Sequence, residues 1–313
     1  MTKTHQAVQG AESDTVGLDS LLRGVQTYLS ERFPVSQAGA VLSSYACCYL
    51  LYGHTQGHQV FRWATVVGGI TVVLLALFRR IVDDAEDLRD DIRSGRFSDA
   101  DGGGRRLRGL ILGGLAAVAL TGLLNASCSL GLLAASVGVA AWVLVVMLIQ
   151  GKTVVAKSRG LQYIVVETCP AVLLLYSYVV WVRASGGSVP TLGVTAIVGL
   201  FWTAFQFWSF TRKMGTEAWA PWRLSVSETR RVLIAFLALT AACNALIYHY
   251  VHLPSEYLLY GLTLPGVFVV LVLRRWSQFP THDPKRMRPS WAGLPFGVAV
   301  EGGVLIAVLV ASL

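Results

Sequence analysis

The sequence predicts an all-α membrane protein: a polytopic bundle of nine transmembrane helices, with the N-terminus in the cytoplasm and the C-terminus outside. Three observations support this. Of the 313 residues, 54% are hydrophobic and 14% are charged, whereas ordinary soluble domains are about 25% charged. Nine apolar stretches are long enough to cross a bilayer, and the basic residues gather in alternate connections between them. This composition excludes a disordered chain and disfavours a soluble globule.

The nine stretches follow one another from residue 35 to the end of the sequence. A membrane-spanning helix needs about 17 to 25 mostly apolar residues. The stretches of that kind are 35–53, 63–82, 109–125, 127–149, 161–182, 189–210, 232–251, 257–273 and 294–313. The break between the third and fourth rests on Asn125, so we expect a helical hairpin with a tight turn there. Residues 1–34 form a cytoplasmic N-terminal segment, and residues 35–313 form one membrane domain.

The basic residues test the number of spans independently, because cytoplasmic loops carry an excess of Lys and Arg. With nine spans, residues 1–34 and every second loop share one side of the membrane. All of the 26 Lys and Arg residues fall on that side except Arg62 and Arg183. The net charge of +8 is therefore one-sided. It suits anionic lipids and anionic substrates, and gives no reason to expect nucleic-acid binding.

Two local features carry smaller predictions. The run from Gly102 to Gly104 predicts a flexible break between helices. All five cysteines lie in apolar runs without ligand spacing, so we interpret them as buried hydrophobic residues and not as disulfides or metal ligands. They are Cys47, Cys48, Cys128, Cys169 and Cys243.

Six of the 18 acidic residues crowd at the cytoplasmic end of the second span. If the helix continues there, Asp83, Asp87 and Asp91 lie four residues apart on one stripe, with Asp84 on the adjoining stripe. Stacked carboxylates repel unless a cation lies between them, and Mg²⁺ binds one or two carboxylates, waters and substrate phosphate oxygens. The four aspartates are therefore candidate catalytic metal ligands. The alternative is a solvated helix end paired with Arg79, Arg80, Arg89 and Arg93.

Two other cytoplasmic ends offer the positive charge that a diphosphate needs. Lys152, Lys157 and Arg159 precede the fifth span, and Arg212 and Lys213 follow the sixth. An arginine binds phosphate oxygens through its fork, and a lysine acts as a mobile point charge. Positive-inside topology alone also places such residues in these loops, so the residue types leave both interpretations open.

The sixth span ends with six aromatic residues between positions 201 and 210. Phe201, Phe205 and Trp208 share one helix face, and Trp202 lies beside them. Ring faces stabilise cations, which matters if a carbon skeleton ionises nearby. An interfacial aromatic belt or ordinary packing is the alternative.

Glu167 and Glu301 are the acidic residues well inside spans. An intramembrane carboxylate is a candidate functional group by default. Each could equally be a neutral, hydrogen-bonded structural acid.

Together these features resemble the UbiA superfamily of intramembrane prenyltransferases. That family has nine helices, a first motif N/D-D-x-x-D-x-x-x-D ending the second helix, and a second motif ending the sixth. The first motif is matched by Asp83, Asp84, Asp87 and Asp91. The second departs from the usual Asp-x-x-x-Asp and is similar to a subgroup with E-x-x-R-K, with Ser209 in place of Glu. It reads Trp208-Ser209-Phe210-Thr211-Arg212-Lys213. Residues 31–34 and 157–159 also look like segments of that subgroup.

The resemblance implies an enzyme of the cytoplasmic membrane with a cytoplasm-facing active site. Mg²⁺ on the four aspartates would hold an allylic prenyl diphosphate, whose chain lies in a membrane-embedded cavity. A small aromatic or other acceptor, or a lipid, would capture the allylic cation. The second motif lacks an aspartate pair, so Arg212 and Lys213 are expected to replace part of a second metal's charge. Diphosphate binding would fall to Lys157, Arg159, Arg212 and Lys213, and cation stabilisation to Phe201, Trp202, Phe205 and Trp208.

Two other functions are weighed against this transferase. A terpene cyclase of the same superfamily ionises the same diphosphate but quenches the cation with the chain's own double bonds. Aromatic crowding and the atypical second motif favour the cyclase, whereas the prevalence of transferases in the superfamily favours the transferase. A transporter would bind cations at the aspartates, but transporter sites lie at mid-membrane on broken helices and not at one helix end. The sequence leaves prenyl chain length, acceptor, number of metal ions and oligomeric state open.

Overall fold

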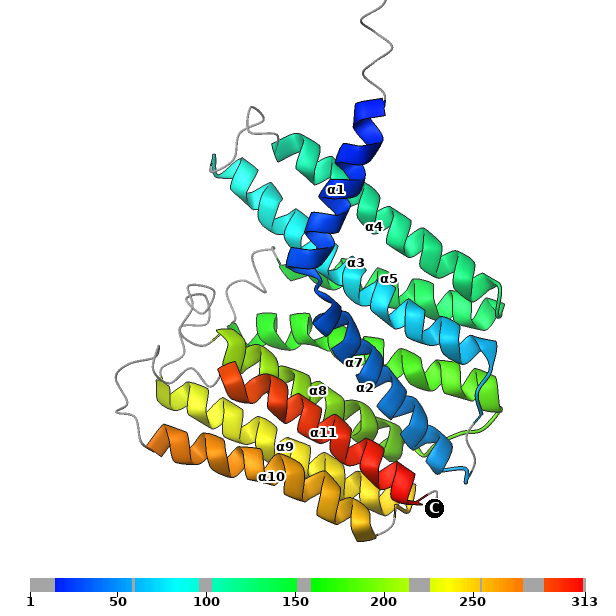
Figure 1. Cartoon of the computed structure of the whole chain (residues 1–313), viewed down its shortest axis with the longest axis vertical. Helices are drawn as coiled ribbons and strands as arrows, with labels where there is room; N and C mark the ends of the chain where they lie inside the picture. The colour runs from blue at the N-terminus through cyan, green and yellow to red at the C-terminus, as the bar shows by residue number, and fades with distance from the viewer. Residues whose placement is uncertain are drawn as a thin grey trace, which may run out of the picture. The chain divides into compact units, whose positions relative to one another are not determined.

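The computed structural model describes residues 15–57, 60–95, 103–150, 159–213, 226–253, 255–277 and 290–311. Every regular element in these ranges is a helix, which confirms the predicted all-α fold class (Figure 1). The helices are α1 (Thr15–Arg32), α2 (Val35–His54), α3 (Trp63–Arg93), α4 (Gly103–Ala126), α5 (Leu130–Gln150), α7 (Arg159–Ser185), α8 (Thr191–Lys213), α9 (Val226–Val251), α10 (Ser255–Ser277) and α11 (Ser290–Ala311). The chain divides into two compact units, residues 1–40 and residues 41–313.

The first unit contains α1, a helix that the sequence analysis did not anticipate. It carries no acidic residue in its first turn and ends at Arg32. Phe33 and Pro34 interrupt the helix, and the Pro34 carbonyl accepts the amide N–H of Gln37 at 2.8 Å as α2 begins. A proline is well suited to this position because its missing N–H would have no partner in a first helical turn.

Each of the nine predicted segments overlaps a helix between α2 and α11. Six of these helices contain a stretch long and apolar enough to cross a membrane: α3, α4, α5, residues 168–185 of α7, residues 191–209 of α8 and residues 231–251 of α9. In α10 and α11 the described apolar stretches are shorter, at 257–271 and 296–310. The apolar helices are those of a membrane protein, and nine spans with a cytoplasmic N-terminus stay predictions.

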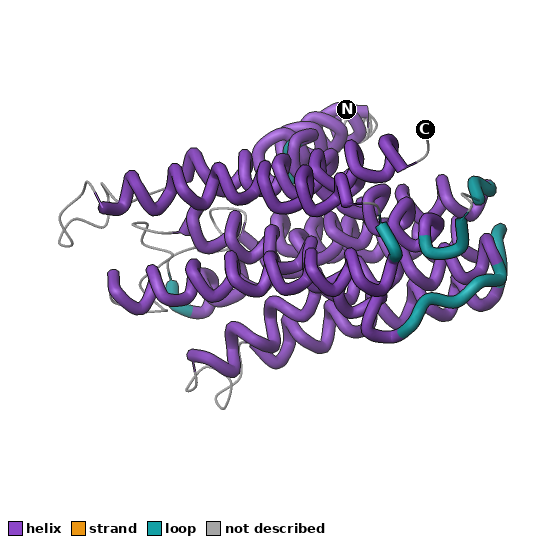
Figure 2. Tube along the Cα trace, turned by 90° about the horizontal axis from the view of Figure 1, so that it is seen from below, coloured by secondary structure: helices purple, strands orange, loops and turns teal. Residues whose placement is uncertain are grey.

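The second unit packs its helices in two groups. In the first, α3 contacts α4, α5 and α7; in the second, α8 contacts α9 and α11, and α10 contacts α11. The contact of α7 with α8 joins the groups. The axes run nearly parallel, and most of the short described loops lie at one end (teal in Figure 2). The last turns of α3 and α8 lie at the opposite end, with the first turns of α4, α7 and α9 (Figure 1).

Buried polar side chains link the helices of each group. Asn125 of α4 donates to Thr71 Oγ1 of α3 at 2.7 Å and accepts a hydrogen bond from the Tyr176 hydroxyl of α7. In the other group, Tyr257 of α10 donates to Asn244 Oδ1 of α9 at 2.5 Å. Such interhelical hydrogen bonds are typical of membrane bundles, where lipid offers no alternative partner.

The connections of α4 test two sequence predictions. The tight turn before α5 is confirmed: α4 ends at Ala126, and Ser129 N–H bonds the Asn125 carbonyl at 2.9 Å. The predicted break at the triple glycine is wrong for Gly103 and Gly104, which form the first turn of α4. Amides of a first helical turn need no intrahelical partner, so glycines are tolerated there, and Gly103 is buried.

Candidate functional site

The aspartate stripe lies on one continuous helix, because α3 runs past residue 82 to Arg93. Asp83, Asp87 and Asp91 therefore occupy successive turns of one face, as the four-residue spacing predicts. Ser94 and Gly95 end the helix: Ser94 N–H bonds the Asp90 carbonyl at 2.9 Å, and Gly95 adopts a φ of 73°. A left-handed residue at this position is a common helix stop, and glycine takes it without strain.

Negative charge at this end of α3 is unfavourable for the helix alone. The C-terminus of a helix carries a partial negative charge from its unpaired carbonyls, and like charges four residues apart repel. The Asp87 carboxylate is repelled by those of Asp83, Asp84 and Asp91, and Arg80 is the cation that attracts it. Among the described residues Asp87 has no ion-pair partner. The stripe therefore concentrates negative charge at one helix end, and a bound divalent cation would offset it.

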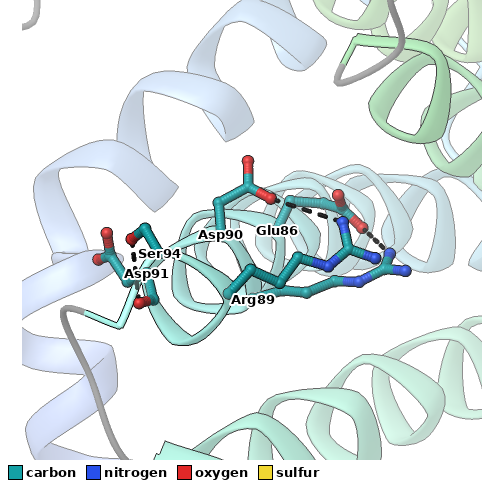
Figure 3. Close-up of polar contacts among 6 residues, drawn as sticks. Glu86, Arg89, Asp90, Asp91 and Ser94 are labelled. Atoms are coloured by element: carbon teal, nitrogen blue, oxygen red, sulfur yellow. Dashed lines mark hydrogen bonds and ion pairs between the residues drawn. The ribbon is translucent and has the colours of Figure 1, made fainter.

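Two acids outside the stripe are neutralised by arginines of the same helix. Arg89 Nη1 lies 3.3 Å from Glu86 Oε1, and Arg93 Nη1 lies 3.9 Å from Asp90 Oδ1 (Figure 3). A surface ion pair of this kind contributes at most about 1 kcal/mol. These pairs correspond to the solvated helix end that the sequence left as an alternative, but they involve acids outside the four candidate ligands.

Arg80 pairs with two of the candidate ligands themselves. Its Nη1 lies 3.1 Å from Asp83 Oδ2, and its Nη2 lies 2.8 Å from Asp84 Oδ1. The Asp84 side chain is only 10% exposed, compared with 35% for Asp83. From the sequence, Arg80 is one of several possible counterions. Arg80 lies three and four residues before Asp83 and Asp84, and this spacing is the signal that could have identified it.

The chemistry of this helix end fits Mg²⁺, which prefers carboxylate oxygens. In the described part of the chain, however, no three His, Cys, Asp or Glu side chains converge tightly enough to hold a metal ion by themselves. One reason is that Asp83 and Asp84 are turned toward Arg80. Mg²⁺ usually keeps waters and substrate phosphate oxygens beside one or two carboxylates, so a closed protein cage is not required.

The basic candidates are placed by their helices. Arg159 begins α7, and Arg212 and Lys213 end α8, at the same end of the bundle as the last turns of α3 (Figure 1). Their side chains lie outside the described residues, as do Lys152 and Lys157 altogether. The helix α7, which begins at Arg159, packs directly on both α3 and α8.

The aromatic residues of α8 divide into packed and partly exposed rings. Phe201 is 2% exposed and belongs to the core, whereas Trp202, Phe205 and Trp208 are partly exposed. The rings of Phe205 and Trp208 are 5.5 Å apart, and Trp202 meets Phe236 of α9 edge-on at 6.0 Å. The core therefore covers Phe201 almost completely and these three rings only in part.

A separate apolar groove of about 380 Å³ lies between α5 and α7. Its lining includes Gly138 and Trp142 of α5 and Val172, Leu175 and Tyr176 of α7. None of the four aromatic candidates of α8 contributes to it.

The structure describes the side chain of one of the two intramembrane acids, Glu301, but not that of Glu167. Glu301 of α11 accepts hydrogen bonds from two serines of α2: Ser43 donates to Oε2, and Ser44 donates to Oε1 at 2.5 Å. These contacts support the structural interpretation of Glu301, and the sequence analysis missed both serines. The side chain of Glu167 in α7 lies outside the described residues.

The prediction that the cysteines are buried is confirmed for Cys47, Cys48, Cys169 and Cys243. All five thiols are free, and four of them are buried; Cys128 is partly exposed.

The chain was compared with known proteins at three levels. No protein-family model and no curated protein matches the sequence. Solved structures do match: the structure of a UbiA homolog from Archaeoglobus fulgidus has a TM-score of 0.58 at 15% identity, covering 91% of this chain and 99% of that one. A digeranylgeranylglyceryl phosphate synthase has a TM-score of 0.57 at 11% identity, covering 93% and 99%. The Archaeoglobus homolog bound to GPP and Mg²⁺ has a TM-score of 0.50 at 16% identity, covering 88% and 99%.

Proposed function

We propose that this chain is a member of the UbiA superfamily and a Mg²⁺-dependent intramembrane prenyltransferase. It would ionise an allylic prenyl diphosphate and transfer the prenyl group to an aromatic or other small acceptor. The observation that carries the proposal is the aspartate stripe of α3 on a fold whose solved examples include one bound to GPP and Mg²⁺ and another bound to DMAPP and Mg²⁺. The enzyme would lie in the cytoplasmic membrane with its site facing the cytoplasm.

Asp83, Asp84, Asp87 and Asp91 would hold the metal. Bound there, Mg²⁺ supplies positive charge to the departing diphosphate. The helix itself keeps the carboxylates one turn apart, and Asp87 is the central member of the stripe. Because no ion pair engages Asp87 in the described part of the chain, none has to be broken before its carboxylate binds a cation.

The diphosphate would also contact cationic side chains from two other helices. Lys157 and Arg159 precede or begin α7, and Arg212 and Lys213 end α8. A charged hydrogen bond to a phosphate oxygen typically contributes about 1.5–3 kcal/mol. Where the second motif usually has acidic metal ligands, this chain has Arg212 and Lys213, so direct contact with phosphate replaces part of the metal's role.

The reaction breaks the allylic C–O bond, and the bonding pair leaves with the diphosphate. The positive charge spreads over the allylic carbons, where the faces of nearby aromatic rings stabilise it. Phe201, Trp202, Phe205 and Trp208 are the rings we assign to this role, and Trp202, Phe205 and Trp208 are the partly exposed ones. A nucleophilic carbon or oxygen of the acceptor then forms the new bond to the prenyl carbon and loses a proton.

The aromatic crowding of α8 favours one other function, a terpene cyclase of the same fold. In a cyclase the double bonds of the chain itself would attack the cation, so no acceptor is needed. Besides the four assigned rings, Phe207 of α8 packs against Phe296 of α11 with ring centres 4.7 Å apart. Both of these rings are buried in the core, so the partly exposed Trp202, Phe205 and Trp208 are the rings that favour this alternative.

One experiment separates the two functions. Purified protein is incubated with Mg²⁺ and prenyl diphosphates of several chain lengths, first without any acceptor and then with a membrane extract. A transferase gives little beyond slow hydrolysis until the extract supplies an acceptor. A hydrocarbon or terpene alcohol formed without extract would overturn the transferase in favour of the cyclase.

A further inference from the structure

The arginine that pairs with the aspartate stripe differs from every other described arginine on α3. Arg89 and Arg93 bind Glu86 and Asp90, which lie outside the candidate ligand set. Arg80 instead spans Asp83 and Asp84 with its two terminal nitrogens, at 3.1 and 2.8 Å. One guanidinium fork therefore holds two of the carboxylates that the proposed function assigns to a metal.

The same guanidinium has hydrogen-bonding capacity left over. Arg80 Nε is buried and has no acceptor in the described part of the chain, and the same is true of Arg79 Nε. A buried N–H without an acceptor is unfavourable, because it has lost water and gained no partner. Both donors lie one turn before the aspartates, so an anion arriving at this helix end would find unmet donors next to the carboxylates.

We propose that Arg80 is an exchangeable counterion of the metal site, an inference that rests on the proposed function. Without metal, Arg80 neutralises Asp83 and Asp84 and keeps their side chains in place. When those oxygens bind a divalent cation, the like charge of the guanidinium is repelled, and Arg80 turns its fork to the diphosphate. Planar, bidentate recognition of phosphate is what a guanidinium does best. Arg80 is thus a positioning residue before the substrate binds and a substrate ligand afterwards.

This exchange has a consequence that a simple helix ion pair does not have. Arg80 competes with a metal that arrives alone, but it assists a metal that arrives with a diphosphate. Metal and diphosphate therefore strengthen each other's binding, and thermodynamic linkage makes the effect reciprocal. Removing Arg80 should therefore tighten the binding of metal alone and weaken the binding of metal together with a diphosphate.

The test measures binding, not turnover. Mn²⁺ serves as the probe, and its free concentration is followed by electron paramagnetic resonance in protein reconstituted into nanodiscs. Titrations are done alone and with an unreactive prenyl thiolodiphosphate, on wild type, Arg80→Gln and Arg80→Lys. Arg89→Gln is the control, because it removes an arginine of the same helix that pairs outside the ligand set. Monodispersity is checked for each variant, and Arg80→Lys keeps the charge if Arg80→Gln does not fold.

For Arg80→Gln we expect Mn²⁺ alone to bind about fivefold more tightly than to wild type, as loss of a partly exposed competing ion pair suggests. With the thiolodiphosphate present, we expect the coupling between the two ligands to fall by about tenfold, within the usual range of coupling strengths. The Mn²⁺ affinity and the coupling measured for Arg80→Lys should lie between those of wild type and Arg80→Gln. Arg89→Gln should match wild type in both titrations.

Unchanged or weaker binding of Mn²⁺ alone by both Arg80 variants would overturn the exchange and leave Arg80 as a structural ion pair. That result is distinguishable from failure of the proposed function. If wild type binds Mn²⁺ neither alone nor with the thiolodiphosphate, the metal site itself is wrong.

Discussion

Replacing Asp87 with asparagine should abolish turnover without destabilising the bundle. The change keeps the shape of the side chain and removes one charge. That charge lies between Asp83 and Asp91 on the same stripe, one turn away on each side. Each like-charged pair at this spacing costs about 0.2–0.5 kcal/mol, so Asp87→Asn should leave the protein equally stable or more stable by up to about 1 kcal/mol.

The effect on activity should have the opposite sign. Even outer-shell partners of a metal typically contribute 10- to 100-fold, so loss of a direct ligand should lower kcat/KM by at least about 100-fold. The assay is release of diphosphate from an allylic prenyl diphosphate by detergent-purified, monodisperse protein, with melting followed in parallel. Asp90→Asn is the matched control, because the Asp90 side chain is 71% exposed and paired with Arg93.

Two results would refute the reasoning about Asp87. The first is an Asp87→Asn enzyme that keeps more than about a tenth of wild-type kcat/KM, a loss smaller than an outer-shell contact normally gives. The second is an equal loss in Asp90→Asn, which would show that charge at this helix end matters and that the stripe does not.

Three further predictions concern the metal, the second motif and the intramembrane acid. Chelation of divalent ions should stop diphosphate release, and added Mg²⁺ should restore it; full activity in chelator would exclude a metal. Arg212→Gln or Lys213→Gln should each reduce kcat or raise KM roughly tenfold or more, whereas Arg231→Gln, on the adjacent helix, should have no kinetic effect. If all three variants have the same kinetics, Arg212 and Lys213 serve only to orient the chain in the membrane. Glu301→Gln should keep activity within about twofold, because the amide oxygen still accepts a hydrogen bond. Ser44→Ala should lower the free energy of unfolding by about 1–3 kcal/mol, because it removes a hydrogen bond to Glu301. A loss of turnover in Glu301→Gln would instead show that Glu301 takes part in the reaction.

Most of the helices could be predicted from local patterns in the sequence. The stripe of Asp83, Asp87 and Asp91 depended on the helix continuing past residue 82, and α3 does run to Arg93. The apolar stretches located the helices from α2 to α11, and the short break at Asn125 predicted the tight turn before α5. The helix α1 was missed because residues 1–34 contain no apolar run of spanning length.

The contacts that organise the site could not be predicted from one sequence. Glu301 and Ser44 are 257 residues apart, and nothing local indicates that they meet. Arg80 is different, since its partners are three and four residues away, but one-sided topology explains a basic residue there equally well. Its role becomes visible only when both of its terminal nitrogens are seen on candidate metal ligands.

We propose that this protein ionises an allylic prenyl diphosphate with the aid of Mg²⁺ and Asp87. The most direct measurement is diphosphate release from prenyl diphosphates of graded length by protein in nanodiscs, with a membrane extract present as a source of acceptors. We expect diphosphate release that is accompanied by a lipophilic prenyl product, stops when divalent ions are chelated and is lost in Asp87→Asn. Folded wild-type protein that releases no diphosphate from any chain length with Mg²⁺ and extract present would contradict it.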